Sequence, residues 1–288
     1  RDFCLSRGLG DVYKRQDYKH MDIGNLFDLT GRVAVVTGGG DGIGKGCCLT
    51  LAAAGAAVVV SDIDGDKAKD VADSIAAAGG KAISTACNVL DDADLVRLID
   101  TAVAAYGTVN ILVNNAGLGG GGRENPFKID MDYVARIYSI NVFAPLRLCQ
   151  LAVPVMGKSG YGSVVNITSM SSVDKEPAMC VYASSKAALN HLAANLAYDF
   201  GPYNVRINNV GPGATNTSAL ASILTLELKE KMLRHTPIKR LGEVSDIAMA
   251  VLFFASPASS WISGQTLFIN GGGDQTLGDL SPVQSMHP

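Results

Sequence analysis

"RVAVVTGGGDGIGKGCCLTLAAAG", residues 32–55, is the stretch that predicts the fold of this chain. It opens with a short run of apolar, mostly β-branched residues, passes through a glycine-rich turn, and continues as an apolar stretch of helical length that a glycine ends. A buried strand followed at once by a helix is the repeating unit of a parallel sheet with helices on both faces. We therefore expect an α/β fold in which the glycines mark the carboxyl end of the first strand.

Six more apolar runs continue this pattern, and stretches of helical length separate them. They read AAVVVSD (56–62), KAISTACNV (81–89), NILVNNAG (110–117), GSVVNITS (162–169), VRINNVGPG (205–213) and QTLFINGG (265–272). A long helix is expected around residues 129–156. Seven strands without a break in composition predict one doubly wound Rossmann-type domain, which binds its ligands beyond the carboxyl ends of the strands.

Composition excludes several classes of partner. The chain has 288 residues, 48% hydrophobic and 18% charged, with a net charge of −3 and no basic run, so we expect no nucleic-acid partner. The longest weakly polar stretch, residues 49–60, is too short to span a bilayer, so no membrane partner is expected. The six cysteines form no C-x-x-C pair and no ligand spacing with the four histidines. This usage predicts a reduced cytoplasmic protein without a metal site.

The N-terminus is expected to be foreign to the fold. Residues 1–20 have no apolar core of the kind a secretory signal needs. The stretch SRGLGDVYKRQ (6–16) fits one reading frame through a sequencing-library adapter. We predict a disordered, adapter-derived tail over residues 1–20 and one domain over 21–288; a natural disordered basic tail is the alternative.

The first two strand ends indicate a dinucleotide site. Glycines between a strand and a helix let backbone amides approach a pyrophosphate at the helix N-terminus. Asp62 ends the second strand about twenty residues after these glycines, where a carboxylate can accept hydrogen bonds from ribose hydroxyls. Asp41 adds a second negative charge, and both would repel a 2′-phosphate. We expect NAD in preference to NADP; a simple turn role for Asp62 is the alternative.

A possible proton-transfer pair lies in YASSK, residues 182–186. On a helix, residues four apart share a face, which brings the Tyr182 phenol and the Lys186 ammonium together. A phenol with a pKa of about 10 is a weak base at neutral pH, and a nearby cation lowers that pKa. Such a pair is also common on ordinary exposed helix faces, so its surroundings must decide.

Four motifs together resemble the short-chain dehydrogenase/reductase family over roughly residues 27–274. They are TGGGDGIG (37–44), NNAG (114–117), Ser169 with Tyr182-x-x-x-Lys186, and PG (212–213), in that order along the chain. The resemblance implies that Tyr182 transfers the proton, that Lys186 and Ser169 assist it, and that Asn141 kinks the long helix and holds a water linked to Lys186. It also implies the cofactor-binding residues Gly38, Asp41, Gly42, Ile43, Gly44, Asp62, Ile63, Asn88, Val89, Asn115, Gly117, Tyr182, Lys186, Pro212, Gly213, Thr215 and Thr217. Asn88 stands where the family usually has an aspartate against the adenine.

Substrate is suggested by other stretches. NITSM, YASSKAA, MLRHTPIKRLG and SPASSWISGQ are most similar to bacterial 7α-hydroxysteroid dehydrogenases, which act on bile acids. Residues 217–240 are rich in leucine and isoleucine, as expected of an apolar flap over a steroid, or of an amphipathic helix packed on the body. We expect reversible NAD-linked oxidation of a 7α-hydroxyl by a homotetramer. The alternatives are a 12α-hydroxysteroid, sugar or 3-oxoacyl-thioester enzyme, and an inactive dinucleotide-binding sensor.

Overall fold

The seven predicted strands form one sheet in which every neighbouring pair is parallel. The structure is a computed structural model, and it describes residues 24–119, 124–175 and 177–273. The strand order is β3-β2-β1-β4-β5-β6-β7, so the direction of winding reverses between β1 and β4. The predicted fold class is therefore confirmed. The strands are β1 Val33–Thr37, β2 Ala57–Asp62, β3 Lys81–Ala86, β4 Ile111–Asn114, β5 Gly162–Ile167, β6 Val205–Pro212 and β7 Thr266–Ile269.

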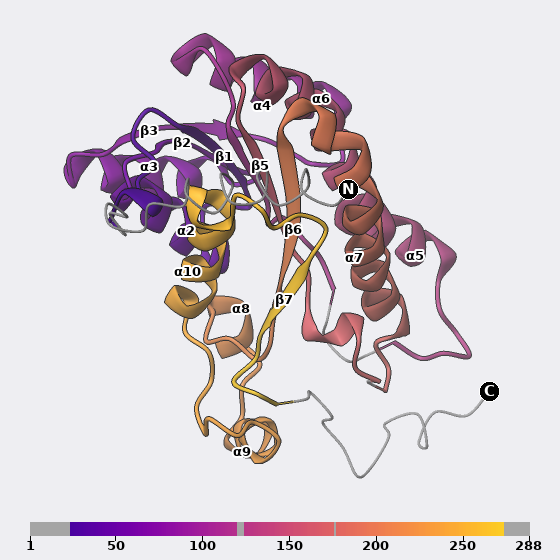
Figure 1. Ribbon diagram of the computed structural model, residues 1–288. Helices are drawn as coiled ribbons and strands as arrows, with labels where there is room; N and C mark the ends of the chain where they lie inside the picture. Colours follow the sequence, from indigo (N-terminus) through magenta and orange to yellow (C-terminus); the bar gives the residue numbers. More distant parts are fainter. Residues whose placement is uncertain (1–23, 120–123, 176, 274–288) are drawn as a thin grey trace, which may run out of the picture.

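Helices cover both faces of the sheet (Figure 1). One layer contains α2 Gly42–Ala53, α3 Gly65–Ala77 and α10 Val244–Ala255; the other contains α4 Asp92–Tyr106, α6 Ala144–Ser159 and α7 Cys180–Phe200. Two apolar clusters fill the space between the layers and the sheet. Along β1, Val36 packs in the first cluster and Val35 in the second. A strand buried on both faces needs apolar residues at every position, which explains its continuous apolar sequence.

The long helix predicted around 129–156 runs from α5 Met131–Tyr138, through a π-helical turn at Ser139–Phe143, into α6. The whole stretch Met131–Ser159 is long and apolar enough to cross a membrane by length and composition alone. Half of its most apolar window is buried inside the protein, and α6 packs against β4, β5 and α4. It is a core helix of the fold.

Buried asparagines connect the strands near their carboxyl ends. Asn114 on β4 donates to Asn166 on β5 at 2.8 Å, and Asn166 donates to Asn209 on β6 at 2.9 Å. Asn209 in turn donates to Thr266 on β7 at 3.0 Å. These residues are also paired in the register of the strands. Because a slip of one residue would leave buried amides without partners, the row of amides favours this register.

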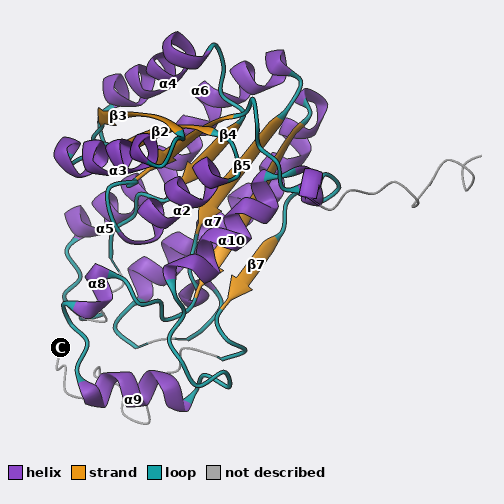
Figure 2. Ribbon diagram, turned by 90° about the vertical axis from the view of Figure 1, so that its left-hand side faces the viewer, coloured by secondary structure: helices purple, strands orange, loops and turns teal. Residues whose placement is uncertain are grey.

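Two short helices lie beyond the carboxyl edge of the sheet, toward which the strand arrows point (Figure 2). They are α8 Ser218–Ala221 and α9 Leu226–Arg234, and neither contains a buried residue. Short 3-10 helices complete the described chain at Gly24–Leu26, Met170–Ser172, Gly201–Tyr203 and Pro257–Ser259. The tail predicted at residues 1–20 lies outside the described residues, so the domain division stays a prediction.

Candidate active site

A cavity of about 860 Å³ opens at the carboxyl ends of the strands. It runs from the glycine turn after β1 to the flap that holds α8 and α9. Of the predicted site residues, only Gly44 and Asn141 do not line this cavity. Nearly all of the predicted site residues therefore surround one cavity, as expected for residues at the strand ends of a parallel sheet.

Gly44 packs closely against the backbone of the glycine turn. A side chain at Gly44 would collide with the carbonyl oxygen of Gly38, which lies before the start of α2, so only glycine allows this close approach. Asn115 holds the same turn, because its Nδ2 donates to the carbonyl oxygens of Thr37 and Gly38, each at 2.9 Å. Its backbone N–H donates to the Thr37 hydroxyl at 3.1 Å. The amide nitrogen of Asn115 thus stabilises the turn, and its predicted contact with ribose remains a prediction.

Asp62 ends β2 and lies directly beside the glycine turn. Its Oδ2 accepts from the Gly40 N–H at 3.0 Å and its Oδ1 from the Asp64 N–H at 3.0 Å. The side chain is half-buried and lines the cavity, so its remaining lone pairs face the space where ribose hydroxyls are expected. Lys67, a cation that sequence reasoning did not consider, also packs against the glycine turn. A Cβ added at Gly40 would lie 2.8 Å from the Lys67 Cβ. Lys67 does not line the cavity, whereas Asp62 does.

Asp41 connects the glycine turn to the flap. It caps helix α2, accepting from the Gly42 N–H at 2.7 Å, and its other oxygen accepts from the Ser218 hydroxyl at 2.5 Å. The Ser218 bond is the largest cause that holds the pKa of Asp41 below its usual value. This contact joins residues 177 positions apart, and no sequence motif marks it.

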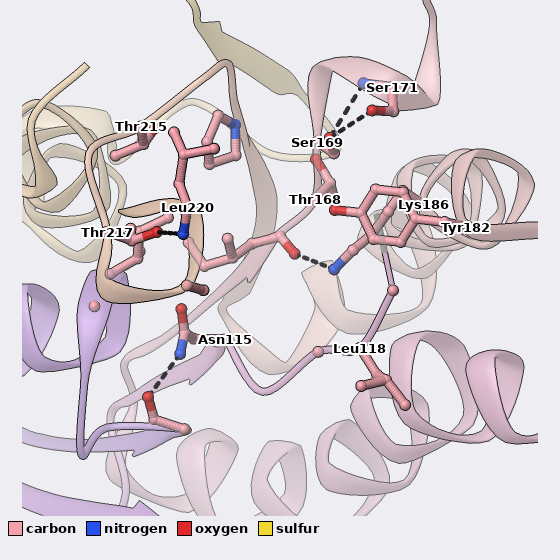
Figure 3. A pocket seen from close by; sticks show the side chains of 18 of the residues that line it. Asn115, Leu118, Thr168, Ser169, Ser171, Tyr182, Lys186, Thr215, Thr217 and Leu220 are labelled. Atoms are coloured by element: carbon pink, nitrogen blue, oxygen red, sulfur yellow. Dashed lines mark hydrogen bonds between the residues drawn. The ribbon is translucent and has the colours of Figure 1, made fainter. Parts of the chain in front are cut away.

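Tyr182, Lys186 and Ser169 lie at the other end of the cavity (Figure 3). Tyr182 and Lys186 come from the first turns of α7, and Ser169 follows β5. The hydroxyls of Ser169 and Tyr182 point toward the same part of the cavity (Figure 3). Ser169 is held in place by the Ser171 N–H, which donates to its Oγ at 3.1 Å.

Lys186 is almost fully buried, with 4% of its surface exposed. Its Nζ donates to the Ile167 carbonyl at 2.9 Å and lies 5.9 Å from the centre of the Tyr182 ring. Burial disfavours the ammonium form and lowers the pKa of Lys186 to about 8. The predicted cation is thus near the phenol, and it is more easily deprotonated than an ordinary lysine.

Asn141 lies in the π-helical turn between α5 and α6 and is fully buried. Its Nδ2 donates to the Leu118 carbonyl at 2.9 Å and to the Ser185 hydroxyl at 3.0 Å, while its Oδ1 accepts from the Leu118 N–H at 3.0 Å. The irregular turn lies where the family resemblance implies a kink. A Cβ added at Gly117 would lie 3.3 Å from the Lys186 Nζ and 3.4 Å from the Asn141 Oδ1, so Gly117 separates the two.

Three other side chains that were predicted to contact the cofactor already make hydrogen bonds within the protein. The Asn88 Oδ1 accepts from the Leu90 N–H at 3.1 Å, and this bond uses one lone pair of the oxygen that was predicted to accept from adenine. The Thr215 hydroxyl donates to the Gly213 carbonyl at 3.0 Å, and the Thr217 hydroxyl caps α8 by accepting from the Leu220 N–H at 3.2 Å. These side chains shape the cavity wall, and their contacts with a cofactor stay predictions.

The predicted flap contributes three large apolar side chains to the cavity: Leu220, Ile223 and Met232. Leu226, another apolar residue of the flap, is 83% exposed and does not line it. Lys231 and His235 lie among the lining residues of the flap, and no carboxylate of the flap does. The flap is therefore apolar where Leu220, Ile223 and Met232 face the cavity, and Lys231 on α9, paired with Glu227 at 2.8 Å, adds a positive charge.

Sequence reasoning also missed Glu124, whose carboxylate accepts from the backbone N–H groups of Val181 and Tyr182 at 2.7 and 3.1 Å. Glu124 lies in the loop after β4, and no motif marks it. Among the described residues, no group of three or more His, Cys, Asp or Glu side chains is arranged to hold a metal ion. The chemistry of the described cavity therefore depends on hydroxyl, amide, ammonium and carboxylate groups.

Known proteins are similar to this chain in sequence and in fold. A family model described as Enoyl-(Acyl carrier protein) reductase matches residues 38–274. The 7alpha-hydroxysteroid dehydrogenase of Escherichia coli (strain K12) is 49% identical over 249 residues, which cover 86% of this chain and 96% of that protein. The chain belongs to the short-chain dehydrogenase/reductase family. The predicted membership is confirmed.

Other members of the family match over similar lengths. An uncharacterized oxidoreductase of Thermotoga maritima is 37% identical and covers 85% of this chain and 98% of its own length. A solved 7 alpha-hydroxysteroid dehydrogenase, complexed with NADH and 7-oxo glycochenodeoxycholic acid, is 48% identical with a TM-score of 0.86. That match covers 90% of this chain and all of the solved one. The short-chain dehydrogenase fold thus extends over the whole described sheet.

Proposed function

We propose that this short-chain dehydrogenase oxidises the 7α-hydroxyl of bile acids to the ketone, reversibly, with NAD as the cofactor. The observation that carries the proposal is the cavity itself, which Ser169, Tyr182 and Lys186 line together with a dinucleotide-type glycine turn and an apolar flap. A relative 49% identical bears the name of this activity, and a solved relative holds NADH and a 7-oxo bile acid. The intact Ser, Tyr and Lys argue against an inactive sensor.

The residues present fit NAD. At Gly39, Gly40 and Gly44 the glycine turn has no room for a side chain, and it leads into the first turn of α2, where the helix dipole would favour a pyrophosphate. Asp62 would hold the ribose hydroxyls, and its charge would oppose the 2′-phosphate of NADP. Thr215 and Thr217, with Pro212 and Gly213, would lie against the nicotinamide end. Once bound, the nicotinamide supplies the acceptor for the hydride.

The side chains of the chain handle the proton. Ser169 donates a hydrogen bond to the substrate oxygen and orients the alcohol toward Tyr182. The Tyr182 phenolate takes the hydroxyl proton as the C–H bond breaks, and the ammonium of Lys186 favours that phenolate. Because the pKa of Lys186 is about 8, Lys186 can itself release and regain a proton near neutral pH. Reduction of the ketone follows the same steps in reverse.

The flap supports a steroid as the substrate. Leu220, Ile223 and Met232 present an apolar surface to the cavity, with Met179 from the turn before α7. Burial of a rigid apolar ring system at about 25 cal/mol per Å² gives useful affinity with few polar contacts. Lys231, which also pairs with Glu227 at 2.8 Å, adds a positive charge that suits the acidic side chain of a bile acid. A sugar would require more polar groups than these residues offer.

Two bile acids test the regiochemistry. Chenodeoxycholate carries a 7α-hydroxyl without a 12α-hydroxyl, and deoxycholate carries the reverse. We expect NADH absorbance to rise with chenodeoxycholate and NAD, and not with deoxycholate. NADP in place of NAD should lower kcat/KM by about tenfold or more, equivalent to ~1.4 kcal/mol. Activity on deoxycholate alone would move the assignment to the 12α position, and activity on neither would leave only the family.

The proposal also covers the oligomeric state and the cellular compartment of the protein. The protein would act as a homotetramer in the cytoplasm, without nucleic-acid or membrane partners. Support for assembly comes from exposed apolar residues beside the last strand, Trp261 at 98%, Met249 at 53% and Leu267 at 40%. Support for a reducing compartment comes from free thiols at Cys47, Cys48, Cys87, Cys149 and Cys180.

A further inference from the structure

The first turn of helix α7, which carries Tyr182, is held by a residue from outside the helix. The residue at its N-cap position, Met179, makes no side-chain hydrogen bond to the turn. A helix start needs acceptors for its first N–H groups. Glu124 supplies two of them: Oε2 accepts from the Val181 N–H at 2.7 Å and Oε1 from the Tyr182 N–H at 3.1 Å. The backbone of Tyr182 is thereby fixed from the loop after β4.

The backbone just before α7 is strained, and Glu124 bonds it as well. Ala178 has a φ of +57°, a left-handed conformation that costs energy for a residue with a Cβ. The backbone N–H of Glu124 donates to the Ala178 carbonyl at 2.9 Å. Ala178 and the next residue, Met179, are each only 6% exposed, and Met179 lines the cavity. The strained residue is therefore followed in sequence by a cavity-lining residue, Met179, and then by the first turn of α7, which carries Tyr182.

Glu124 is itself held in one orientation. The Tyr133 hydroxyl on α5 donates to its Oε1 at 3.2 Å. Burial raises the pKa of Tyr133, and the adjacent Glu124 carboxylate raises it further. Cys180 is close enough to be affected as well: burial raises the pKa of its thiol, and the Glu124 carboxylate raises it further. Three elements thus meet at this carboxylate: the loop after β4, α5 and α7.

We propose that Glu124 is a positioning residue for proton transfer, which it serves by fixing the first turn of α7 so that the Tyr182 hydroxyl faces the substrate beside Ser169. This inference rests on the proposed role of Tyr182. Glu124 does not line the cavity, so it acts through Tyr182 and not on the substrate. Its effect should be large, because a misplacement of about 1 Å can cost on the order of 100-fold in rate.

The isosteric variant Glu124→Gln tests the proposal. Both carboxylate oxygens are in use, whereas glutamine has one acceptor and would turn an NH₂ group toward a backbone N–H. We expect kcat to fall about tenfold or more while NADH affinity, measured by NADH fluorescence, and KM for the alcohol stay unchanged. Glu124→Ala loses both acceptors and should lower kcat further. The assay uses the full chain and the alcohol that the unaltered enzyme oxidises best.

Glu243→Gln provides a matched control. Glu243 caps helix α10 in a reciprocal box with Asp246, and it does not line the cavity. This substitution should lower the melting temperature without changing kcat. A wild-type kcat in Glu124→Gln, whatever its melting temperature, would overturn the proposal, as would a parallel loss of NADH affinity. Failure of the proposed function would instead be seen in the unaltered enzyme, as inactivity toward bile acids, or as full activity in Tyr182→Phe.

Discussion

Tyr182 is placed by contacts from three directions. Helix α7 carries it, Lys186 lies 5.9 Å from its ring one turn further on, and Glu124 accepts from its N–H. The end of β5 brings Ser169 to the same part of the cavity. A phenol in this setting can exchange a proton with a substrate hydroxyl, provided that the phenolate is favoured by the buried cation.

Tyr182→Phe isolates that hydroxyl. The variant keeps the aromatic ring and its packing but cannot transfer a proton, so kcat should fall by about a thousandfold or more. NADH binding should survive, because the cavity wall keeps its shape. Stopped-flow turnover and fluorescence titration of NADH on one preparation measure both quantities. Near-normal turnover would remove Tyr182 from its assigned role.

Lys186 makes stability depend on pH in a defined direction. Its pKa in the folded protein, about 8, lies below its ordinary value of 10.5 because burial opposes the charge. Below pH 8 both folded and unfolded chains hold the proton, and the folded state bears the full cost of the buried ammonium. Between about pH 8 and 10.5 the folded chain has released this proton while the unfolded chain retains it, so this contribution to the free energy of unfolding rises with pH.

The comparison with Lys186→Met measures this effect. Methionine fills similar space without a charge, so the other titrating groups cancel in the difference. The stability advantage of Lys186→Met over the unaltered protein should shrink by up to ~3 kcal/mol from pH 8 to 10.5. Urea unfolding at several pH values gives the two curves. A difference that is constant with pH would mean that Lys186 is not desolvated in solution.

Residue types at strand ends could be predicted from the sequence, whereas their partners could not. Asp62 and Ser169 follow buried strands, and a parallel sheet brings such positions together at one edge. Glu124 belongs to no motif, and it reaches the backbone of Tyr182 only through tertiary folding. Glu124 contacts a helix 57 residues later in the chain. Contacts of this length depend on how the elements pack, and no local pattern encodes that.

At the scale of elements, the inner strands could be predicted because burial on both faces leaves a continuous apolar run, whereas the edge strands β3 and β7 are only partly buried. The flap could be predicted only in composition. Its helices α8 and α9 contain no buried residue, so the apolar pattern did not decide which leucines face the cavity. Leu226, for example, is 83% exposed and does not line the cavity. The link between flap and glycine turn, Asp41 to Ser218, depends on a hydroxyl with no special sequence context.

Ser218→Ala tests this link between elements. Loss of the hydroxyl that donates to Asp41 frees α8 from the glycine turn, so the flap should close less well over a bound cofactor. An exposed bond to a charged group is worth about 1 kcal/mol, so KM for NAD should rise roughly fivefold. Ser222→Ala is the control, because that hydroxyl bonds only the Ala219 carbonyl of the same flap. Equal KM values in the two variants would show that the link is not needed.

At the scale of the whole molecule, the sheet ends in an edge with exposed apolar side chains. β7 is the last strand in the order, and its outer edge has no neighbouring strand among the described residues. Met249, Trp261 and Leu267 are exposed at 53%, 98% and 40% on and near this edge. Such edges promote association unless another chain covers them. A second copy of the chain is the simplest cover, in keeping with the proposed tetramer.

Trp261 makes this testable because it is the single tryptophan of the chain. If copies associate over this edge, its emission at micromolar concentration should be that of a buried indole and should shift to the red on dilution. Light scattering should give the mass of four chains. Trp261→Glu should lower that mass without unfolding the chain, since the side chain is 98% exposed in one copy, whereas Trp261→Phe should keep the tetramer. A monomer mass with the emission of a water-exposed indole would contradict assembly over this edge.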